Sequence, residues 1–255
     1  DIPFEELKIE DIGFQKTNLA FEIPEADLHI IKTYEETRNF PAVKGTTQLG
    51  VHLRFGTISV RKLAKIAKEN NLTFLKELIW REFFMQILYH FPKVVNHSFK
   101  SKYDAIPWEN NPEFLEKWKA GKTGFPIVDA GMRELNATGF MHNRVRMITA
   151  SFLIKHLLTD WRIGEAYFAE KLMDYDLSAN NGNWQWCASS GCDAAPYFRI
   201  FNPDEQQKKF DPDFKYIKKW IPEFGTKYYP KPIVEHKKAR EKVLKVYKEA
   251  LDNLD

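Results

Sequence analysis

Cysteine is scarce in this chain of 255 residues, which contains only Cys187 and Cys192. Their spacing fits neither a zinc site nor a disulfide framework, so the sequence predicts reduced thiols in a cytosolic protein and no metal centre. Long hydrophobic runs are also lacking, because none reaches the roughly 18 residues of a membrane-spanning helix. These shortages argue against a disulfide-rich secreted domain and against a membrane span.

Alternation of apolar and polar residues, which is typical of a strand, is almost absent, and from about residue 27 the pattern is helical. Ser59 and Thr73 are expected to cap helices that run to positions 70 and 91. Asn111 followed by Pro112 predicts another helix start. Further helices are predicted over residues 126–138, 142–158, 164–173 and about 234–251. The expected fold class is therefore all-α.

Charge is distributed unevenly along the chain, although the net charge is only +3. Residues 1–40 carry ten acidic residues against four Lys or Arg, whereas residues 206–255 carry thirteen Lys or Arg against eight acidic residues. A polyanion would be repelled by the first region and tolerated by the last. Charge alone leaves a nucleic-acid partner open.

The most unusual segment is "DYDLSANNGNWQW", residues 174–186, which crowds acids, amides and indoles together. Asp174 and Asp176 could form a metal site or an acid–base pair, but no histidine and no third carboxylate lie at suitable spacing. An ion pair with Arg146 or Arg144 is the preferred interpretation. The three asparagines are either turn and cap residues or groups for the edge of a heterocycle, because each amide offers a donor and an acceptor.

Two predicted helices carry polar side chains on shared faces. Asn143, Arg146 and Met147 are spaced three and four residues apart, so they share one face, whereas Arg144 points elsewhere. In the helix over residues 73–91, Glu77 and Trp80 share a face in the same way. Glu77 is expected either as a half-exposed surface residue or, if buried against the indole, as a carboxyl with a raised pKa.

The segment "KGTTQLGVHLRFG", residues 44–56, places hydroxyls and spaced glycines just before a capped helix. Hydroxyls and free backbone N–H groups suit a phosphate, although this is not the nucleotide-binding P-loop pattern. Trp108, Trp161 and Trp184 lie on three separate segments. Taken singly, each is expected in the core.

Together these segments resemble the photolyase/cryptochrome family, and within it the C-terminal FAD-binding domain of class I cyclobutane pyrimidine dimer photolyases. The matching motifs run in the family's order over roughly residues 30–222. They are "NFPAVKGTTQLGVHLRFGTIS", "LKELIWREFF", "GKTGFPIVDAGMRELNATGFMHNRVRMITASFLIK" and "DYDLSANNGNWQWCASSGCDAAPYFRIFNP".

The resemblance implies FAD bound in a U shape inside the helical domain. The phosphates would be held by one tyrosine and one loop, namely Tyr34, Thr46, Thr47, Gln48, Leu49 and Gly50. The family usually has Arg where Gln48 stands and Ser where Gly50 stands, so one hydroxyl contact is missing here. The isoalloxazine and ribityl groups would be surrounded by Arg144, Arg146, Asp174 and Asp176, with Asp174 paired to Arg146 and Asn180 at flavin N5.

The resemblance also implies a substrate and a reaction. The substrate would be UV-damaged DNA with a flipped-out pyrimidine dimer, repaired by electron transfer from excited FADH⁻. The lesion pocket would be lined by Glu77, Trp80, Asn143, Met147 and Trp186. Trp80 and Trp186 would be its walls, while Glu77 and Asn143 would read the base edges and Glu77 would stabilise the dimer radical anion. Trp184, Trp161 and Trp108 match the three-indole chain that reduces oxidised flavin.

A blue-light signalling cryptochrome is the alternative on the same fold. Plant-type cryptochromes carry Asp where this chain has Asn143, and animal-type ones replace the Asn180 amide. A (6-4) photolyase would need histidines where Asn143 and Met147 stand, and the DASH branch usually has Gln and Tyr in place of Met147 and Trp186. From a different class, a helical nucleic-acid-binding module with a decayed flavin site would have lost the amide, acid or arginine positions.

The resemblance finally sets the expected organisation. Relatives carry an N-terminal α/β antenna domain that this sequence does not encode, so we expect a fragment and an antenna pigment on the missing domain. Residues 1–26 are expected to be the linker from that domain, and residues 27–255 the FAD- and lesion-binding catalytic domain. We expect a monomer in the cytoplasm of a prokaryote, with access to DNA.

Overall fold

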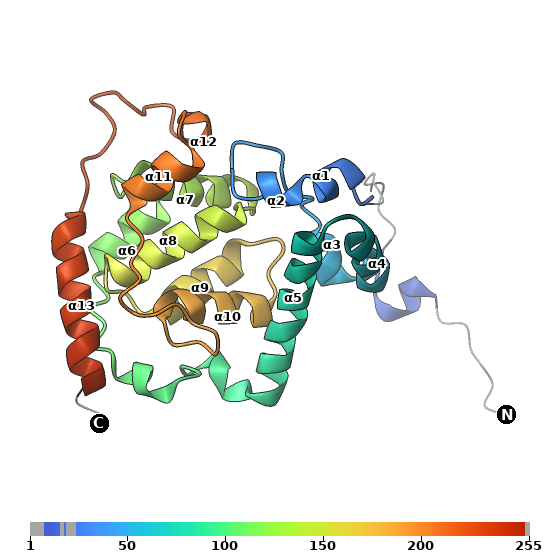
Figure 1. The fold of residues 1–255 in the computed structure, drawn as a ribbon, viewed down its shortest axis with the longest axis horizontal. Helices are drawn as coiled ribbons and strands as arrows, with labels where there is room; N and C mark the ends of the chain where they lie inside the picture. Colours follow the sequence, from blue (N-terminus) through green and yellow to red (C-terminus); the bar gives the residue numbers. More distant parts are fainter. Residues whose placement is uncertain (1–7, 16–17, 19–23, 253–255) are drawn as a thin grey trace.

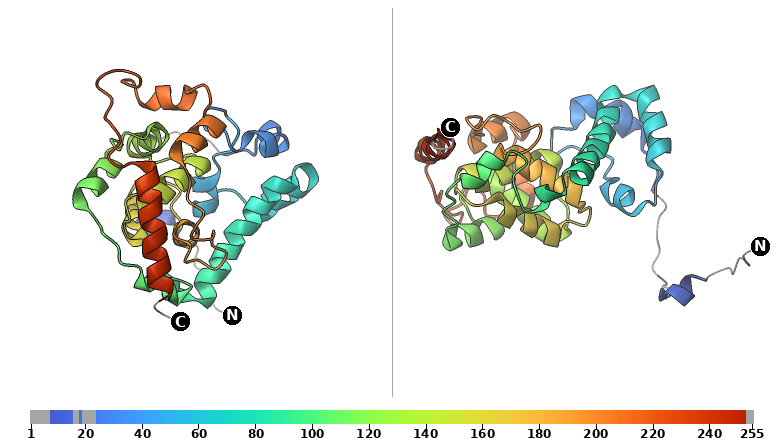
Figure 2. Two further views of the ribbon diagram at one scale, coloured as in Figure 1. Left: turned by 60° about the vertical axis from the view of Figure 1, so that its left-hand side comes forward. Right: turned by 90° about the horizontal axis from the view of Figure 1, so that it is seen from below.

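A computed structural model describes residues 8–15, 18 and 24–252 of the chain. Every regular element in these ranges is a helix, which confirms the all-α fold class (Figure 1). Much of the expected linker, residues 1–26, falls outside the described residues. Its described part contains the exposed 3-10 helix η1 (Ile9–Ile12), which lies apart from the helical body in Figure 2.

Two groups of helices make up the body. The first group lies to the right in Figure 1 and consists of α1 (Leu28–Lys32), α2 (Tyr34–Thr37), α3 (Gly50–Phe55), α4 (Val60–Asn70) and the long α5 (Leu72–His90). The second group consists of η2 (Pro92–Val95), η3 (Ser101–Ala105), α6 (Pro112–Lys119), α7 (Pro126–Thr138), α8 (Asn143–Lys155), α9 (Trp161–Lys171), α10 (Leu177–Ala188), α11 (Pro203–Phe210), α12 (Lys215–Trp220) and α13 (His236–Asp252).

Capping residues set most of the helix ends. Ser59 accepts a hydrogen bond from the N–H of Lys62, and Asn111 caps α6 ahead of Pro112, as the sequence predicts. The predicted cap of α5 is wrong by two residues: Asn71, not Thr73, accepts the N–H of Phe74. Asn71 also ends α4 in an extended conformation, which leaves its side chain at the start of the next helix.

Other predicted boundaries shift slightly. Helix α8 ends at Lys155 rather than at position 158, and α9 starts three residues earlier than predicted, where Asp160 caps it. Gly139 ends α7 as predicted, with a φ of 68° that favours glycine. The last helix runs over His236–Asp252, close to the predicted 234–251.

Helix α8 lies at the centre of the main hydrophobic core. Nine of its thirteen residues are buried, so neighbouring helices cover it on almost every side. Helices α7, α9 and α10 all pack against it. Helix α5 differs, because it keeps large apolar side chains such as Ile79 and Trp80 more than 40% exposed. One side of α5 is therefore left open beside the core.

Both cysteines lie among the described residues. Cys187 is buried and Cys192 is exposed, and both are free thiols. No group of three or more His, Cys, Asp or Glu in the described ranges is arranged to hold a metal ion. Among the same residues, no helix combines the length and the apolar character that crossing a bilayer requires.

The end of α8 and the start of α13 are joined by a contact between a buried histidine, His156, and a half-buried one, His236. Nε2 of His156 lies 2.8 Å from Nδ1 of His236, and the His156 ring stacks on Phe152. Burial lowers the pKa of His156 from its ordinary value of 6.5 to about 3, and His236 acts in the same direction. A folded protein in which this ring stays neutral loses stability in acid, because the unfolded chain takes up the proton first.

We predict that the free energy of unfolding falls between pH 7.5 and pH 5, and that His156→Gln removes about 2 kcal/mol of this fall. The unfolded histidine titrates near 6.5, whereas the folded one does not gain a proton until about pH 3. Urea unfolding at several pH values measures the effect. His29→Gln, at an exposed position of α1, is the control and should leave the pH dependence unchanged. Parallel pH dependences of wild type and His156→Gln would contradict the prediction.

Candidate functional site

Two cavities adjoin beside α8 and α10. The inner cavity encloses about 580 Å³, its open mouth included, between α8, α10 and the turn after α9. It is lined by Asn143, Arg146, Met147, Ala150, Phe168, Leu172, Asp174, Tyr175, Asp176, Ala179, Asn180, Asn183, Trp184, Trp186 and Cys187.

The outer cavity encloses about 850 Å³, again with its mouth, between α5, α8 and α10. It is lined by Arg38, Glu77, Trp80, Arg81, Phe84, Asn143, Met147, Ala179, Asn183, Trp186 and Asp193. Five residues line both cavities: Asn143, Met147, Ala179, Asn183 and Trp186. A group bound in one cavity would therefore be separated from a group in the other by little more than side chains.

A half-buried ion pair lies on the wall of the inner cavity. Nη2 of Arg146 donates to Oδ2 of Asp174 at 2.9 Å, and Nε of Arg146 donates to the carbonyl oxygen of Met141. The predicted pairing of Asp174 with Arg146 is thus present. The second oxygen of Asp174, Oδ1, is buried and has no hydrogen-bond partner among the described residues. A buried carboxylate oxygen without a partner is costly, so this atom fits a ligand that donates a hydrogen bond.

Asp176, on the same cavity wall, acts as the N-terminal cap of α10. Its carboxylate caps α10 by accepting the N–H of Ala179 at 3.1 Å, and the Ser178 hydroxyl also donates to it. Arg144 lies outside both cavities, where its guanidinium donates to Asn39 at 2.6 Å and lies 4.4 Å above the Phe210 ring. The predicted divergence of Arg144 from the Arg146 face is therefore present, with a partner that the sequence does not reveal.

The Asn180 amide is oriented by Glu165, a residue of α9 that the sequence analysis missed. Nδ2 of Asn180 donates to the Glu165 backbone oxygen at 3.0 Å and to its carboxyl at 2.9 Å. Both N–H groups of the amide are thereby used, which leaves Oδ1 to accept a hydrogen bond in the cavity. Burial raises the pKa of Glu165, while the hydrogen bond from Asn180 opposes the rise.

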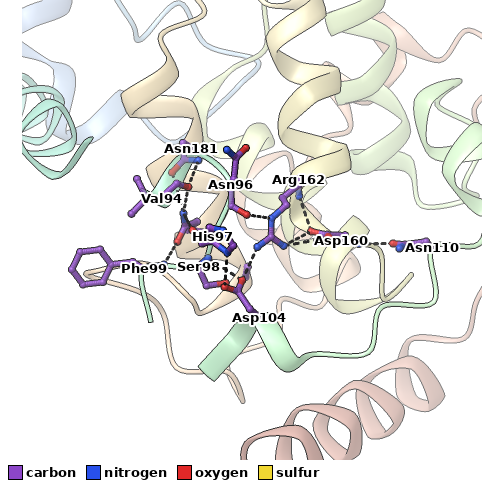
Figure 3. Close-up of polar contacts among 12 residues, drawn as sticks. Val94, Asn96, His97, Ser98, Phe99, Asp104, Asn110, Asp160, Arg162 and Asn181 are labelled. Atoms are coloured by element: carbon purple, nitrogen blue, oxygen red, sulfur yellow. Dashed lines mark hydrogen bonds and ion pairs between the residues drawn. The ribbon is translucent and has the colours of Figure 1, made fainter. Parts of the chain in front are cut away.

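Helix α10 presents different residues on different sides, which accounts for its unusual sequence. Asn180 and Trp184 face the inner cavity, and Trp186 lies between the two cavities. On another side, Asn181 and Gln185 donate to the carbonyl oxygen of Val94 at 2.9 and 3.0 Å (Figure 3). Gln185 also accepts the N–H of Phe99 at 2.8 Å. These bonds fasten α10 to the segment that follows α5.

A second set of polar contacts holds the rest of that segment (Figure 3). Arg162 of α9 donates to the carbonyl oxygen of Asn96 at 2.8 Å and pairs with Asp104 at 2.6 Å. It also pairs with Asp160, whose N–H donates to the Asn110 side chain at 2.8 Å. Residues 92–110 are thus bonded to α9 as well as to α10, and this segment carries Trp108.

In the outer cavity, Glu77 is a member of an ion pair and not a carboxyl isolated against an indole. Arg38 of the segment after α2 pairs with it, and the guanidinium also lies 5.4 Å from the centre of the Tyr34 ring. Burial and the neighbouring Glu77 together raise the pKa of Tyr34 to about 12. Arg38 is a second residue that the sequence analysis missed, because it lies 39 positions from Glu77.

The loop over residues 46–50 approaches the Arg146–Asp174 ion pair of the inner cavity. Thr46 and Thr47 are half-buried, and Gln48 is exposed with a φ of 54°. A Cβ built on Gly50 would lie 2.7 Å from Oδ2 of Asp174, closer than real contacts allow. Glycine at this position therefore permits the loop to approach the Asp174 carboxylate. Tyr34 and this loop lie near the cavities without lining either.

The three indoles of the predicted chain differ in burial. Trp184 and Trp161 are 2% and 1% exposed in the main core, whereas Trp108 is half-buried at its edge. The centre of the Trp108 ring lies 6.1 Å from that of Tyr247, and Trp184 contacts Phe168 at 5.0 Å. Of the three, Trp184 lines the inner cavity, whereas Trp161 and Trp108 line neither of the two cavities described above. Trp108 is thus the most exposed of the three indoles.

Comparisons with known proteins show the family to which the chain belongs. The model of the FAD binding domain of DNA photolyase matches residues 74–227. The deoxyribodipyrimidine photo-lyase of Escherichia coli (strain K12) is 48% identical over 246 residues, covering 85% of this chain and 52% of that protein. The corresponding protein of Halobacterium salinarum is 42% identical over 253 residues, covering 86% of this chain and 53% of that protein. The chain spans about half the length of the curated relatives it matches.

Solved structures give the same result. A bacterial class III photolyase from Agrobacterium tumefaciens superposes with a TM-score of 0.82 at 42% identity, covering 87% of this chain and 53% of the other. A Synechocystis cryptochrome superposes with a TM-score of 0.78 at 31% identity, covering 86% and 52%. Since the family model covers well over half of the chain, and the helices superpose on photolyase and cryptochrome structures, the chain belongs to the family of FAD binding domains of DNA photolyase.

Proposed function

We propose that this chain binds FAD and UV-damaged DNA and repairs cyclobutane pyrimidine dimers in a reaction driven by light. The observation that carries the proposal is the pair of adjoining cavities with a shared wall. One cavity offers groups suited to a flavin, and the other offers aromatic walls and a few polar side chains suited to flipped-out bases.

The donor set of the inner cavity fits FAD. The unpartnered oxygen of Asp174 and the side-chain oxygen of Asn180 would accept hydrogen bonds from the ring and ribityl groups, with Arg146 and Asp176 beside them. Thr46, Thr47 and the backbone of residues 48–50, together with Tyr34, would hold the phosphates. Arg144, predicted beside the flavin ring, lies outside both cavities against Asn39 and Phe210 and has no place in this set. When bound and reduced, the flavin supplies the electron that light makes available.

The outer cavity would hold the lesion. Trp80 and Trp186, from α5 and α10, would enclose the two bases between indole surfaces, which bury apolar area and exclude water. Glu77 and Asn143 would read the base edges through hydrogen bonds. The guanidinium of Arg38 already compensates the charge of Glu77, so this carboxylate is held in place before the DNA arrives.

Three further residues would restore the active state of the flavin. Trp184 lines the inner cavity, Trp161 is buried, and Trp108 is the partly exposed member, so electrons would pass inward from Trp108. The segment that carries Trp108 is fastened to α9 and α10 by the contacts of Figure 3. We further propose that the protein acts as a monomer in the cytoplasm.

The test of the function uses the purified 255-residue chain loaded with reduced FAD. It should retain an oligonucleotide that carries one pyrimidine dimer more tightly than the undamaged oligonucleotide, and it should remove the dimer under blue light but not in the dark. A flavin-loaded protein that shows no preference for damaged DNA and removes no dimers in light would contradict the proposal. That outcome would favour a cryptochrome-type light receptor.

Asp174→Asn should weaken FAD binding roughly 10- to 100-fold, because it removes the charge that Arg146 compensates and one acceptor of the inner cavity. Titration of the apoprotein with FAD, followed by flavin fluorescence, measures the change. Asp213→Asn alters a mostly exposed carboxylate and serves as the matched control. Equal affinities of Asp174→Asn and wild type would remove Asp174 from the flavin site.

Glu77→Ala should lower the repair yield about tenfold, the worth of one hydrogen bond to a charged group, while FAD stays bound. Repair is followed by loss of the dimer per absorbed photon in FAD-loaded protein. Glu82→Ala, at an exposed position of the same helix, controls for effects on α5 itself. An unchanged yield in Glu77→Ala would refute a role for this carboxylate in the lesion cavity.

Trp108→Phe should slow the photoreduction of oxidised FAD, because phenylalanine is much harder to oxidise than tryptophan. Chemically reduced protein needs no electron from the indoles, so repair should still proceed. Absorbance changes of the flavin under blue light follow the reduction, and Trp220→Phe, at another half-buried indole, is the control. Photoreduction at the wild-type rate in Trp108→Phe would exclude Trp108 from the chain.

A further inference from the structure

Trp80 of the outer cavity is supported by a second aromatic ring. Phe84, one turn further along α5, stacks on it with ring centres 5.9 Å apart and an angle of 29° between the planes. Phe83 meets the edge of the same indole at 5.3 Å. Because Trp80 is 41% exposed, these rings supply much of the packing that fixes its orientation.

Phe84 in turn lies against the backbone of α10 at Gly182. A Cβ built on Gly182 would lie 2.2 Å from Cδ1 and 2.5 Å from Cε1 of the Phe84 ring. Any side chain at position 182 would therefore push the ring away or force α5 and α10 apart. The close contact of the two helices at this point requires glycine.

Phe84 also lies between the outer cavity and a third space behind it, and Asp193 borders both spaces as well. This rear cavity measures about 290 Å³ with its open mouth included, and its lining includes Phe84, Ile87, Gly182 and Gln185. The position of the ring thus depends on its two contacts, with Trp80 in front and Gly182 beside it.

The two contacts connect the walls of the outer cavity. Trp80 and Phe84 are one turn apart on α5, and Gly182 and Trp186 are one turn apart on α10, so each pair shares a helix face. The chain of contacts from Trp80 through Phe84 and Gly182 to Trp186 therefore sets how far apart the two indoles stand.

We propose that Phe84, seated on Gly182, is a positioning residue that fixes the width of the outer cavity and hence its preference for a pyrimidine dimer over undamaged bases. The inference rests on the proposed function, since it concerns the substrate of that cavity. A covalently joined pair of bases is more compact than two separate ones, so the separation of the walls determines how well each fits.

The test is a double-mutant cycle on the FAD-loaded chain with Gly182→Ala, Phe84→Ala and the double variant. The measured quantity is the affinity for an oligonucleotide with one dimer and for the same oligonucleotide without damage. Gly182→Ala should weaken dimer binding roughly tenfold through overpacking and leave binding of undamaged DNA unchanged. With Phe84 truncated, the added methyl group has room, so Gly182→Ala should cost less than about twofold in that background.

Two controls accompany the cycle. Ile87 lines the rear cavity but not the outer one, so Ile87→Val should bind both oligonucleotides like wild type. FAD absorbance and thermal unfolding show whether each variant is folded, and Phe84→Leu replaces Phe84→Ala if the latter is too unstable to purify.

The outcomes separate the inference from the function on which it rests. Suppose that wild type prefers damaged DNA. The proposed positioning role of Phe84 is then overturned if Gly182→Ala leaves dimer binding unaffected, or weakens it equally with and without the Phe84 ring. Equal loss of affinity for damaged and undamaged DNA also overturns it. Absence of a dimer preference in wild type overturns the proposed function, and with it the proposed positioning role of Phe84.

Discussion

Both cavities depend on the position of helix α10, which is held by the buried amides of Asn181 and Gln185. The two side chains are 2% and 1% exposed, and both donate to one carbonyl oxygen, that of Val94. A buried amide without partners costs about 1–3 kcal/mol, so these bonds strongly favour one rotation of α10 about its axis. Consecutive residues of a helix point about 100° apart. The rotation that satisfies the two amides also turns Asn180 and Trp184 to the inner cavity and places Trp186 between the cavities.

The carboxylate of Asp174 on the cavity wall is bonded less completely than the buried carboxylate of Asp129 in the core. The core acid Asp129 accepts bonds from Thr123, Gly124 and Tyr229, so its buried charge is surrounded by donors. Asp174, by contrast, keeps one buried oxygen without a partner in the described part of the chain, although Arg146 pairs with the other. Native proteins leave few such atoms, and those that remain call for an explanation. A ligand that donates a hydrogen bond to Asp174 is the explanation that fits its place on a cavity wall.

Much of the fold could be predicted from local sequence, because caps and apolar periodicity are local signals. Ser59, Asn111 and Gly139 mark helix ends in the structure as they do in the sequence. The cap of α5 was predicted two residues late, since Asn71 and Thr73 are both good caps and only the end of α4 decides between them. The shared face of Asn143 and Met147 follows from helical spacing, and both residues line both cavities.

The remainder of the site depends on contacts between distant segments. Glu165 orients Asn180 from another helix, and Arg38 pairs with Glu77 across 39 positions, so no periodicity within one helix could reveal either residue. Gly182 offers a similar case, because a glycine inside a helix predicts only weakened helicity. The requirement for glycine at position 182 becomes clear only in the structure, where the Phe84 ring packs against its backbone.

The shared wall has a consequence for what the two cavities can do together. Met147 and Trp186 border both spaces, and neither side chain carries a charge. The charged residues stand on the outer sides instead, with Arg146 and Asp174 at the inner cavity and Arg38 and Glu77 at the outer one. Each pair is internally compensated, so a charge created in either cavity meets fixed partners of both signs at short range. The wall between these two polar surfaces therefore consists of two amides, a thioether, an indole and a methyl group, with no ionisable side chain among them.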